Sequence, residues 1–338
     1  MQALAIKYRP KSFDDVTEQD SIKLILKQQL TSNAIQHCYL FVGGAGTGKT
    51  TTARIFADEI NKGQGNPIEL DAASNNSVDD MRDLIQQAQT KSLNSEYKVF
   101  IIDECHMITV QGWNAILKLI EEPPAKSIFI FCTTDPQKIP KTIISRVQRY
   151  DFQRISQKGI HIRLIEICQY EQITNYKADA IEYIAKIADG GMRDAITLLD
   201  KCLAYSTDLT LENVVKALGT VDYTTMIDLT RAVVCTDSLS VVNIIEDIHS
   251  SGKDVKQFVR QYGHFLLDVQ KYAIGCDWKY INIPKLTEYE KWLASLSNED
   301  FETVRALARD IVKLNSTIKY SATPKLDVEA DLLIFCGG

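Results

Sequence analysis

The feature that most constrains this chain is the segment GGAGTGKT at residues 43–50, which lies between two patterned stretches. An apolar run at residues 39–42 precedes it, and a helix-compatible stretch at residues 51–57 follows. A strand, a glycine loop and a helix in this order form a phosphate cradle, because glycines let backbone N–H groups turn inward and the helix start adds partial positive charge. Lys49 would reach the β- and γ-phosphates, and Thr50 would place its hydroxyl on Mg²⁺. The predicted phosphate-binding residues are Gly43, Gly44, Ala45, Gly46, Thr47, Gly48, Lys49, Thr50 and Thr51.

The length and the cysteine pattern bound the class of protein. A chain of 338 residues has room for two or three domains, each with its own core. Its eight cysteines form no CxxC pair, which favours reduced thiols in a cytoplasmic protein. The amino terminus has no long apolar core, and no uninterrupted apolar run reaches about 18 residues. We therefore expect neither a secretion signal nor a membrane span.

The distribution of charge limits how the chain can contact nucleic acid. A net charge of −6 argues against the overall basic surface of many non-specific DNA-binding proteins. Of the 38 lysines and arginines and the 44 aspartates and glutamates, residues 1–155 hold 18 of each, so the acidic excess lies in the second half. Any nucleic-acid contact is expected from local positive groups or helix N-termini of the first half.

Apolar runs alternate with helical patterns in the first half of the chain. The runs at residues 39–42, 99–102 and 128–131 have the composition of strands that are buried on both faces. A helical pattern begins at Val78, and Ser77 is in position to cap it. This alternation predicts a mostly parallel α/β sheet. From about residue 156 the strand signal vanishes and helical spacing continues, so we expect three parts: 1–155, 156–207 and 208–338.

A second motif ends the apolar run at residues 99–102. If this strand lies beside the phosphate loop, Asp103 comes near Mg²⁺ and Glu104 near the water that attacks the γ-phosphate. Thr50 and Asp103 are thus the predicted magnesium ligands. Each motif alone has a structural alternative. The glycine segment could be a turn before an ordinary helix, and Asp103 with Glu104 could be an exposed acidic pair at a strand end. Together they favour an ATPase, and the letters DECH at residues 103–106 also admit a DExH helicase.

The flanking segments resemble the clamp-loader branch of the AAA+ ATPases, and within it the gamma/tau subunits of the bacterial replicative polymerase. The resemblance is dense from residue 3 to about residue 203, and beyond that only a helical region of suitable length matches. It implies an α/β AAA+ P-loop domain with a parallel sheet, an all-α lid and an all-α collar that holds a pentamer. The matching segments are AIKYRPKSFDDVTEQD, ELDAASNNSVDDMRDL, HMITVQGWNAILKLIEEPP, IFIFCTTDPQKIPKTIISRVQRYDF and ADGGMRDAITLLDK.

The resemblance also implies roles for individual residues. Thr134 corresponds to sensor 1, which holds the attacking water or reads the γ-phosphate. Arg193 corresponds to sensor 2, which reaches from the lid to the nucleotide. Arg146 corresponds to the arginine finger, which acts on the ATP of a neighbouring subunit. The adenine-side wall corresponds to Tyr8, Arg9, Pro10 and Val16.

Each of these three residues also has an ordinary structural interpretation. Thr134 would then cap a strand end, and Arg193 would pair with Asp189 or Asp194 at the surface, which is worth little. Arg146 would be a solvated charge, because a finger has no target inside its own subunit. If the finger interpretation holds, the protein must be an oligomer whose hydrolysis depends on assembly.

Contact with DNA is expected through phosphates rather than base edges, so the resemblance implies no sequence specificity. Asn75, Asn76 and Ser77 lie where the family often has basic or hydroxyl residues at a helix start that faces DNA. Amide and hydroxyl donors would make this binding less salt-dependent than a grip by arginines and lysines. Lys118 and Lys126 are possible positive contacts, and solvated lysines are the alternative.

Two departures from the family concern what the chain lacks. The gamma/tau subunits usually carry a four-cysteine zinc module, but here only residues 61–67 separate the helical stretch from the next element, so no zinc is expected. The chain also ends at residue 338 without the long extension of the tau form. A reduced subunit from a phage or a divergent bacterium would explain both, and so would a truncated chain. Two smaller departures, Val147 after Ser145-Arg146 and Gly191 after Gly190, remove no catalytic group.

The sequence thus predicts the ATP-hydrolysing subunit of a sliding-clamp loader, with ATP and Mg²⁺ as cofactors. Its expected partners are other loader subunits, the sliding clamp and primer-template DNA. No membrane is expected among them. Hydrophobic residues between Met107 and Trp113 are expected on the clamp-facing side. A DNA motor, either a DExH helicase or a branch-migration ATPase, is one alternative. A non-hydrolysing structural subunit is the other, and Lys49, Glu104 and Arg146 disfavour it because such a subunit needs none of them.

Overall fold

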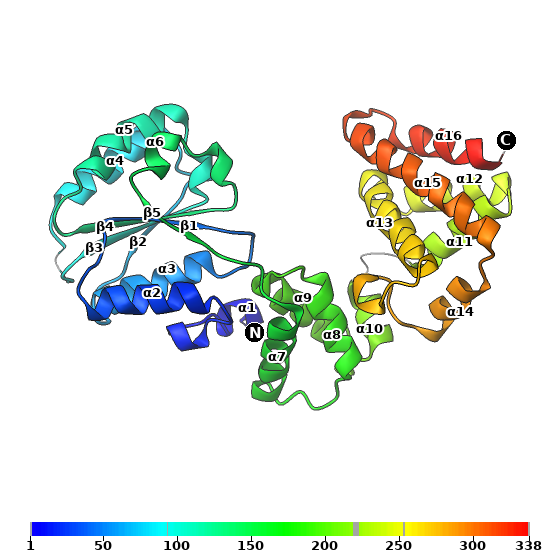
Figure 1. The fold of residues 1–338 in the computed structure, drawn as a ribbon, viewed down its shortest axis with the longest axis horizontal. Helices are drawn as coiled ribbons and strands as arrows, with labels where there is room; N and C mark the ends of the chain where they lie inside the picture. The colour runs from blue at the N-terminus through cyan, green and yellow to red at the C-terminus, as the bar shows by residue number, and fades with distance from the viewer. Residues whose placement is uncertain (1, 93, 219–222, 253, 337–338) are drawn as a thin grey trace. The chain divides into compact units, whose positions relative to one another are not determined.

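The computed structural model describes residues 2–92, 94–218, 223–252 and 254–336, which fall into two compact units (Figure 1). The first unit comprises Met1–Asn175 and Ile184–Lys201. The second comprises Tyr176–Tyr183 and Cys202–Gly338.

The first unit is built on a parallel five-stranded sheet with the strand order β2-β3-β4-β1-β5. Every residue of β1 and β4 is buried, as expected for the centre of a parallel sheet that is covered on both faces. The order places β4 between β1 and β3, so the carboxyl ends of these three strands meet at one edge. The strands are β1 (Cys38–Val42), β2 (Ile68–Asp71), β3 (Lys98–Asp103), β4 (Ser127–Thr133) and β5 (Gln148–Asp151).

Helices cover both faces of this sheet, each over its own apolar core. Figure 1 shows α2 and α3 on one face and α4, α5 and α6 on the other. Tyr39 and Ile101 belong to the first core, and their neighbours Leu40 and Phe100 belong to the second, because successive side chains of a strand point to opposite faces. The helices of this part are α1 (Leu4–Lys7), α2 (Asp20–Thr31), α3 (Lys49–Ile60), α4 (Val78–Gln89), α5 (Val110–Glu121), α6 (Lys141–Ile144) and α7 (Gln157–Tyr170).

The predicted parallel α/β sheet is confirmed, and each of the three predicted strands is present with slightly longer ends. Two further strands, β2 and β5, were not predicted. Both lie at the edges of the sheet, and their sequences IELD and QRYD are polar at alternate or most positions. An edge strand needs little apolar surface, so it lacks the continuous apolar run by which the central strands were found.

The described residues of the second unit are helical apart from a single bridge between Tyr176 and Leu209. The loss of strand signal after about residue 156 is thereby confirmed for the described part of the chain. Two long helices, α13 and α15, pack together at the centre of the apolar core of this unit. Helices α8 (Ala178–Ile187) and α9 (Met192–Tyr205) cross the boundary between the units, and those that follow are α10 (Leu211–Leu218), α11 (Tyr223–Val234), α12 (Ser238–Ser250), α13 (Val255–Ala273), α14 (Thr287–Ser295), α15 (Asn298–Thr317) and α16 (Pro324–Cys336).

A search of the described helices for membrane-spanning segments found none with the length and apolar character that crossing a bilayer requires.

Candidate active site

The glycine loop joins the end of β1 to the start of α3, as the sequence predicts. Gly46 and Gly48 have φ angles of +69° and +99°, a region that favours glycine because a Cβ there meets the backbone. The Thr47 hydroxyl donates to the carbonyl oxygen of Gly44 at 2.9 Å and closes the loop. A Cβ on Gly43 would lie 2.7 Å from the carbonyl oxygen of Phe152, so this position also requires glycine. The loop conformation is therefore fixed by its own sequence.

Lys49 occupies the centre of this loop. Its side chain is buried, and its Nζ donates to the carbonyl oxygens of Gly43 at 2.8 Å and Gly44 at 2.7 Å. Burial lowers the pKa of Lys49, while the carboxylates of Glu104 and Asp103 act in the opposite direction. The side chain thus lies across the loop where a phosphate group would be held, and it has hydrogen-bond donors to offer a phosphate.

The two predicted magnesium ligands are in direct contact. The Thr50 hydroxyl donates to Oδ2 of Asp103 at 2.8 Å, so the carboxylate at the end of β3 reaches across the end of β4 to the start of α3. Hydroxyl and carboxylate oxygens beside a phosphate loop fit Mg²⁺, which is usually held by one or two protein oxygens together with phosphates and water. Among the described residues, no group of three or more histidine, cysteine, aspartate or glutamate side chains is placed to hold a metal ion by itself.

Glu104 follows Asp103 and is held by residues at the end of the neighbouring strand. Its backbone has a φ of 46°, and its N–H donates to Oδ1 of Asp103 at 2.9 Å. The hydroxyl of Thr134, which comes directly after β4, donates to Oε2 of Glu104 at 3.1 Å. The hydroxyl of Thr133 accepts from the N–H of Asp135 instead, so Thr133 supports the turn after the strand. The sequence prediction did not include His106, whose Nδ1 lies 3.3 Å from the same Oε2.

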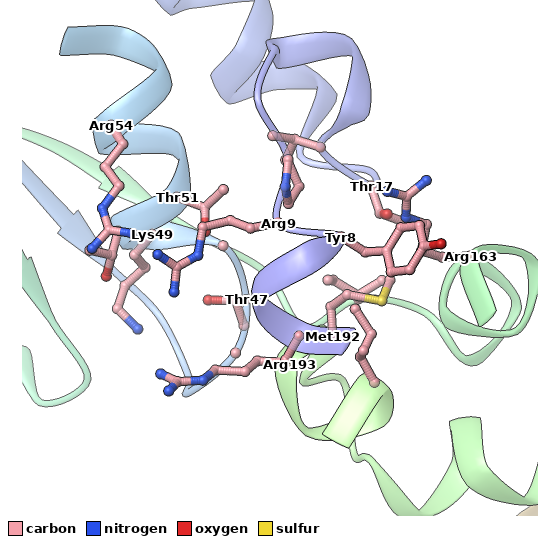
Figure 2. A pocket seen from close by; sticks show the side chains of 18 of the residues that line it. Tyr8, Arg9, Thr17, Thr47, Lys49, Thr51, Arg54, Arg163, Met192 and Arg193 are labelled. Carbon is pink, nitrogen blue, oxygen red and sulfur yellow. The ribbon is translucent and has the colours of Figure 1, made fainter. Parts of the chain in front are cut away.

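A pocket next to the loop is lined by the predicted adenine-side residues, and all of its lining residues belong to the first unit (Figure 2). The nitrogen ends of Lys49, Arg9 and Arg193 lie at the same end of this pocket in Figure 2. Tyr8 lines the pocket and stacks on Tyr170 of α7, with the ring centroids 6.0 Å apart. The lining includes the predicted Tyr8, Arg9, Pro10 and Val16 and the unpredicted Ala5, Thr17, Arg54, Ile155, Arg163, Met192 and Ile196.

Arg193 extends into this pocket from the start of α9. The N–H of the preceding Met192 donates to the carbonyl oxygen of Gly46 at 3.0 Å, which ties this helix to the phosphate loop. The Asp189 partner considered from the sequence pairs with Arg154 instead. Within the described residues, the Arg193 guanidinium has neither a hydrogen bond nor an ion pair, so its donors are available to a ligand of the pocket.

Arg146, the predicted arginine finger, is bound by residues outside the pocket. Its Nε donates to Oε1 of Glu121 at 2.8 Å, and its Nη1 donates to the carbonyl oxygen of Thr142 at 2.8 Å. It is exposed and does not line the pocket. In the described part of the chain, the hydrogen bonds of Arg146 are with residues outside the pocket, and its role as a finger remains a prediction.

The candidate DNA contacts have partners inside the protein. Ser77 caps α4 as predicted, because its hydroxyl oxygen accepts from the N–H of Asp80 at 3.2 Å. In return, the N–H of Ser77 donates to Oδ2 of Asp80 at 2.9 Å. The side-chain amide of Asn75 donates to the carbonyl oxygen of Asp71, and the carbonyl oxygen of Asn76 accepts from the Thr109 hydroxyl. Lys118 is exposed on α5, and Lys126 pairs with Glu96.

The expectation of an apolar surface between Met107 and Trp113 needs a correction. Met107 and Val110 are exposed, at 44% and 68%. Trp113 is only 2% exposed, because it packs on Phe131 of β4 from the inner face of α5. Ile108 is also buried, so the exposed apolar surface of this segment is limited to two side chains.

Gly190 supports the site at the turn before α9, and its replacement gives a test of this packing. Its φ is +84°, and a Cβ there would lie 2.6 Å from Cβ of Arg154. We expect Gly190→Ala to lose about 1–2 kcal/mol for the left-handed backbone and about 1–3 kcal/mol more for the clash. Gly63→Ala is the matched control, because Gly63 has a φ of +75° with open space around it. Urea unfolding should show the larger loss for Gly190→Ala, and equal midpoints would contradict this packing.

The comparisons with known proteins agree with this geometry. Residues 66–156 match the family model for the DNA polymerase III delta subunit, and residues 159–208 match that for the ATPase lid domain of the DNA polymerase III clamp loader subunit. The tau subunit of DNA polymerase III from Bacillus subtilis is 38% identical over 293 residues, which cover 80% of this chain and 52% of that protein. The gamma/tau subunit of Mycobacterium tuberculosis is 37% identical over 282 residues, which cover 76% of this chain and 48% of that protein. The chain therefore spans about half the length of the curated relatives it matches.

Solved structures share the fold at lower identity. The Holliday junction branch migration motor RuvB of Thermotoga maritima superimposes with a TM-score of 0.52 at 20% identity, over 67% of this chain and 79% of that one. A point mutant of the same motor gives a TM-score of 0.52 at 18% identity, over 86% and 94% of the two chains. These likenesses support the fold alone.

The strand order, the phosphate loop and the Thr50–Asp103 contact together define a P-loop protein of the AAA+ class. Within this class, its sequence is similar to the gamma/tau subunits of bacterial DNA polymerase III, and residues 159–208 match the ATPase lid domain of the clamp loader subunit.

Proposed function

We propose that this protein is an ATP-hydrolysing subunit of a sliding-clamp loader, which opens the clamp and places it on primed DNA. The observation that carries this proposal is the contact of Thr50 with Asp103 and of Thr134 with Glu104, beside a phosphate loop that holds Lys49. A subunit that only binds ATP needs the loop, but it does not need a carboxylate held against a polar strand end. The similarity to the gamma/tau subunits and the match to the clamp-loader lid domain support the clamp and primed DNA as the proposed partners of this chemistry.

The chain's residues divide the work between binding and catalysis. Lys49 and the N–H groups of the loop would hold the β- and γ-phosphates, and the pocket beside Tyr8 and Val16 would receive the adenine. Thr50 and Asp103 would hold Mg²⁺, which when bound neutralises charge that develops on the phosphate oxygens. Glu104 would accept the proton of the attacking water, with Thr134 orienting the carboxylate.

The lid and the collar would couple this site to assembly. We propose that residues 1–155 form the nucleotide domain, 156–207 the lid and 208–338 the collar of a pentamer. Arg193 would report the nucleotide to the lid, because it lies in the pocket at the start of α9. Arg146, exposed and remote from its own loop, would complete the site of a neighbouring subunit. The eight cysteines form no CxxC pair, and this spacing fits a cytoplasmic protein.

The same proposal assigns the outer surfaces to partners. Met107 and Val110 would face the clamp, since they are the exposed apolar residues of the segment after the catalytic strand. Primed DNA would be contacted through its phosphates by the start of α4, near Asn75, Asn76 and Ser77, and by Lys118. Because Ser77 and Asn75 already have internal partners, we expect these contacts to be weak and to involve few released counterions.

An ATPase assay on the purified assembly tests this function. Turnover should rise when the cognate clamp and primed DNA are both present, and either partner alone should stimulate less. Steady turnover with duplex unwinding in the absence of any clamp would favour the motor instead. No turnover under any of these conditions would favour the structural subunit.

Removing the proposed base gives a sharper test of the chemistry. We expect Glu104→Gln to bind ATP normally and to hydrolyse it about 10²–10⁴-fold more slowly, because an amide cannot accept the water's proton. The assembly should then hold ATP and stay bound to the clamp, which can be followed by the release of labelled clamp. Glu59→Gln, on the exposed side of α3, is the control. Rapid release of the clamp by Glu104→Gln would contradict the assigned role.

A further inference from the structure

One oxygen of the Glu104 carboxylate lies close to two different side chains. Oε2 accepts from the Thr134 hydroxyl at 3.1 Å and lies 3.3 Å from Nδ1 of His106. Among the described residues, no protein group binds the other oxygen, Oε1. The side chain of Glu104 is 40% exposed, whereas that of His106 is only 12% exposed. A carboxylate fixed at one oxygen and open at the other is oriented for a water molecule at the open side.

The carboxylate of Glu104 favours one ring nitrogen of His106 as the carrier of the hydrogen. Oγ1 of Thr133 lies 3.2 Å from Nδ1 of His106, and it already accepts from the N–H of Asp135 at 3.0 Å. If Nδ1 lacked a hydrogen, its lone pair would face the Oε2 carboxylate oxygen, which is repulsive. With a hydrogen on Nδ1, the ring donates to the Thr133 oxygen and presents the same N–H beside Oε2 of Glu104. The contacts therefore favour the tautomer with N–H at Nδ1.

The fold places these groups together from two adjacent strands. Glu104 and the short 3₁₀ helix Cys105–Met107 come directly after β3, while Thr133 ends β4 and Thr134 follows it. The backbone of Glu104 lies in the left-handed region at a φ of 46°, which is uncommon for a residue other than glycine. Such a conformation persists where the surrounding contacts hold it. His106 and Thr134 supply those contacts at the side-chain end.

We propose that His106 is a positioning residue, which acts with Thr134 to hold Oε2 of Glu104 so that Oε1 faces the attacking water. His106 itself would touch neither ATP nor water. This inference rests on the proposed function, in which Glu104 takes the water's proton while the water oxygen bonds to the γ-phosphorus and the bond to the ADP oxygen breaks. Without His106 the carboxylate would remain but would sample other rotamers, so hydrolysis would slow while ATP binding would not.

The contact can be tested without any ATPase activity. The full chain has five histidines, so a ¹⁵N-histidine NMR spectrum can be assigned by substitution. We expect the two-bond correlations of His106 to show the hydrogen on Nδ1, and we expect this pattern to change in Glu104→Ala. An N–H at Nε2 in the wild-type protein, or a pattern that is indifferent to Glu104→Ala, would overturn the proposal.

Kinetics of the assembly tests the consequence. We expect His106→Ala to lower kcat by about 10- to 100-fold, a part of what a general base contributes, with the Kd for ATP changed less than about twofold. His106→Asn should restore kcat to within about threefold, since its side-chain N–H occupies the place of Nδ1–H. His249→Ala, on the exposed end of α12, is the control.

The outcomes separate this inference from the function on which it rests. If the wild-type assembly hydrolyses ATP but His106→Ala keeps the wild-type kcat, only the positioning role fails. A loss of kcat in His106→Asn as large as in His106→Ala would also overturn it, because a hydrogen-bond donor would then not be the relevant property. If the wild-type assembly shows no turnover, the proposed function fails, and the NMR experiment still tests the contact between His106 and Glu104. If His106→Ala does not fold, the kinetics of His106→Asn and the ¹⁵N-histidine NMR spectrum still test the proposal.

Discussion

Replacing Arg146 by alanine is expected to abolish ATP hydrolysis in the assembly while each subunit still binds ATP. The guanidinium is exposed and is held by Glu121 and the carbonyl oxygen of Thr142, outside the pocket of its own subunit. A finger supplied to a neighbouring site contributes about 10³–10⁵-fold to hydrolysis. Turnover of an assembly made wholly of Arg146→Ala subunits should therefore fall by at least about 10³-fold. Binding of a fluorescent ATP analogue should be unchanged.

A second arginine distinguishes this role from a general loss of positive charge. Arg149 is also exposed, and it pairs with Asp151 on its own strand. Arg149→Ala should therefore keep nearly full turnover under the same conditions. Unchanged turnover in the all-Arg146→Ala assembly would rule out the finger role and would leave Arg146 as a surface residue that is bound to Glu121.

Replacing Lys49 by alanine is expected to remove ATP binding itself. The buried Nζ bridges the carbonyl oxygens of Gly43 and Gly44 and is the amine nearest the place of the phosphates. At an ATP concentration about one hundred times the wild-type Kd, binding stabilises the folded protein by about 2.7 kcal/mol. A thermal unfolding experiment with Mg²⁺ and ATP should show this stabilisation for the wild-type chain, and Lys49→Ala should show none.

The control for this experiment is Lys158→Ala, an exposed lysine of α7 away from the pocket. It should keep the full shift on addition of ATP. A wild-type shift in Lys49→Ala would contradict the assignment of this residue to the phosphates. It would also remove the reason for placing the γ-phosphate next to Glu104.

The phosphate loop and the catalytic strand could be predicted because their signals are local. The glycines at 46 and 48 adopt the positive φ angles that the pattern implies, and Lys49 begins α3 directly after them. The contact between Thr50 and Asp103 joins residues far apart in the sequence. The two motifs predict it because both residues are expected to hold one metal ion in the proposed function. Here the chemistry of the ligand provides the long-range information.

Other parts of the site depend on packing that no local pattern reports. The edge strands β2 and β5 have too few apolar residues to form a run, so the strand order was not predictable from runs alone. Trp113 was expected at the surface because it follows Met107 and Val110. The helical register of α5 turns it inward onto Phe131. The spacing of apolar residues along α5 would have predicted that Trp113 faces the core.

The contact of His106 with Glu104 was missed for a different reason. Its ring depends on Thr133 and Thr134 of the neighbouring strand, so the sequence shows only a histidine two residues after the acid. Arg193 lines the pocket, and its role there remains a prediction. The competing partner Asp189 was excluded only by the structure, in which Asp189 pairs with Arg154. A sequence cannot select the ion-pair partner of a surface arginine, because several acidic side chains lie close enough along the chain to pair with it.

The most direct test of the central claim is ATP-dependent loading of the cognate ring clamp onto primed circular DNA by the purified assembly. The proposed function predicts that closed rings accumulate on primed circles when ATP is hydrolysed, and that few accumulate on fully double-stranded circles. Loading should disappear in assemblies of Arg146→Ala or Lys49→Ala subunits. Equal loading without ATP, or strand separation with no clamp placed on the DNA, would contradict the assignment of this chain to a clamp loader.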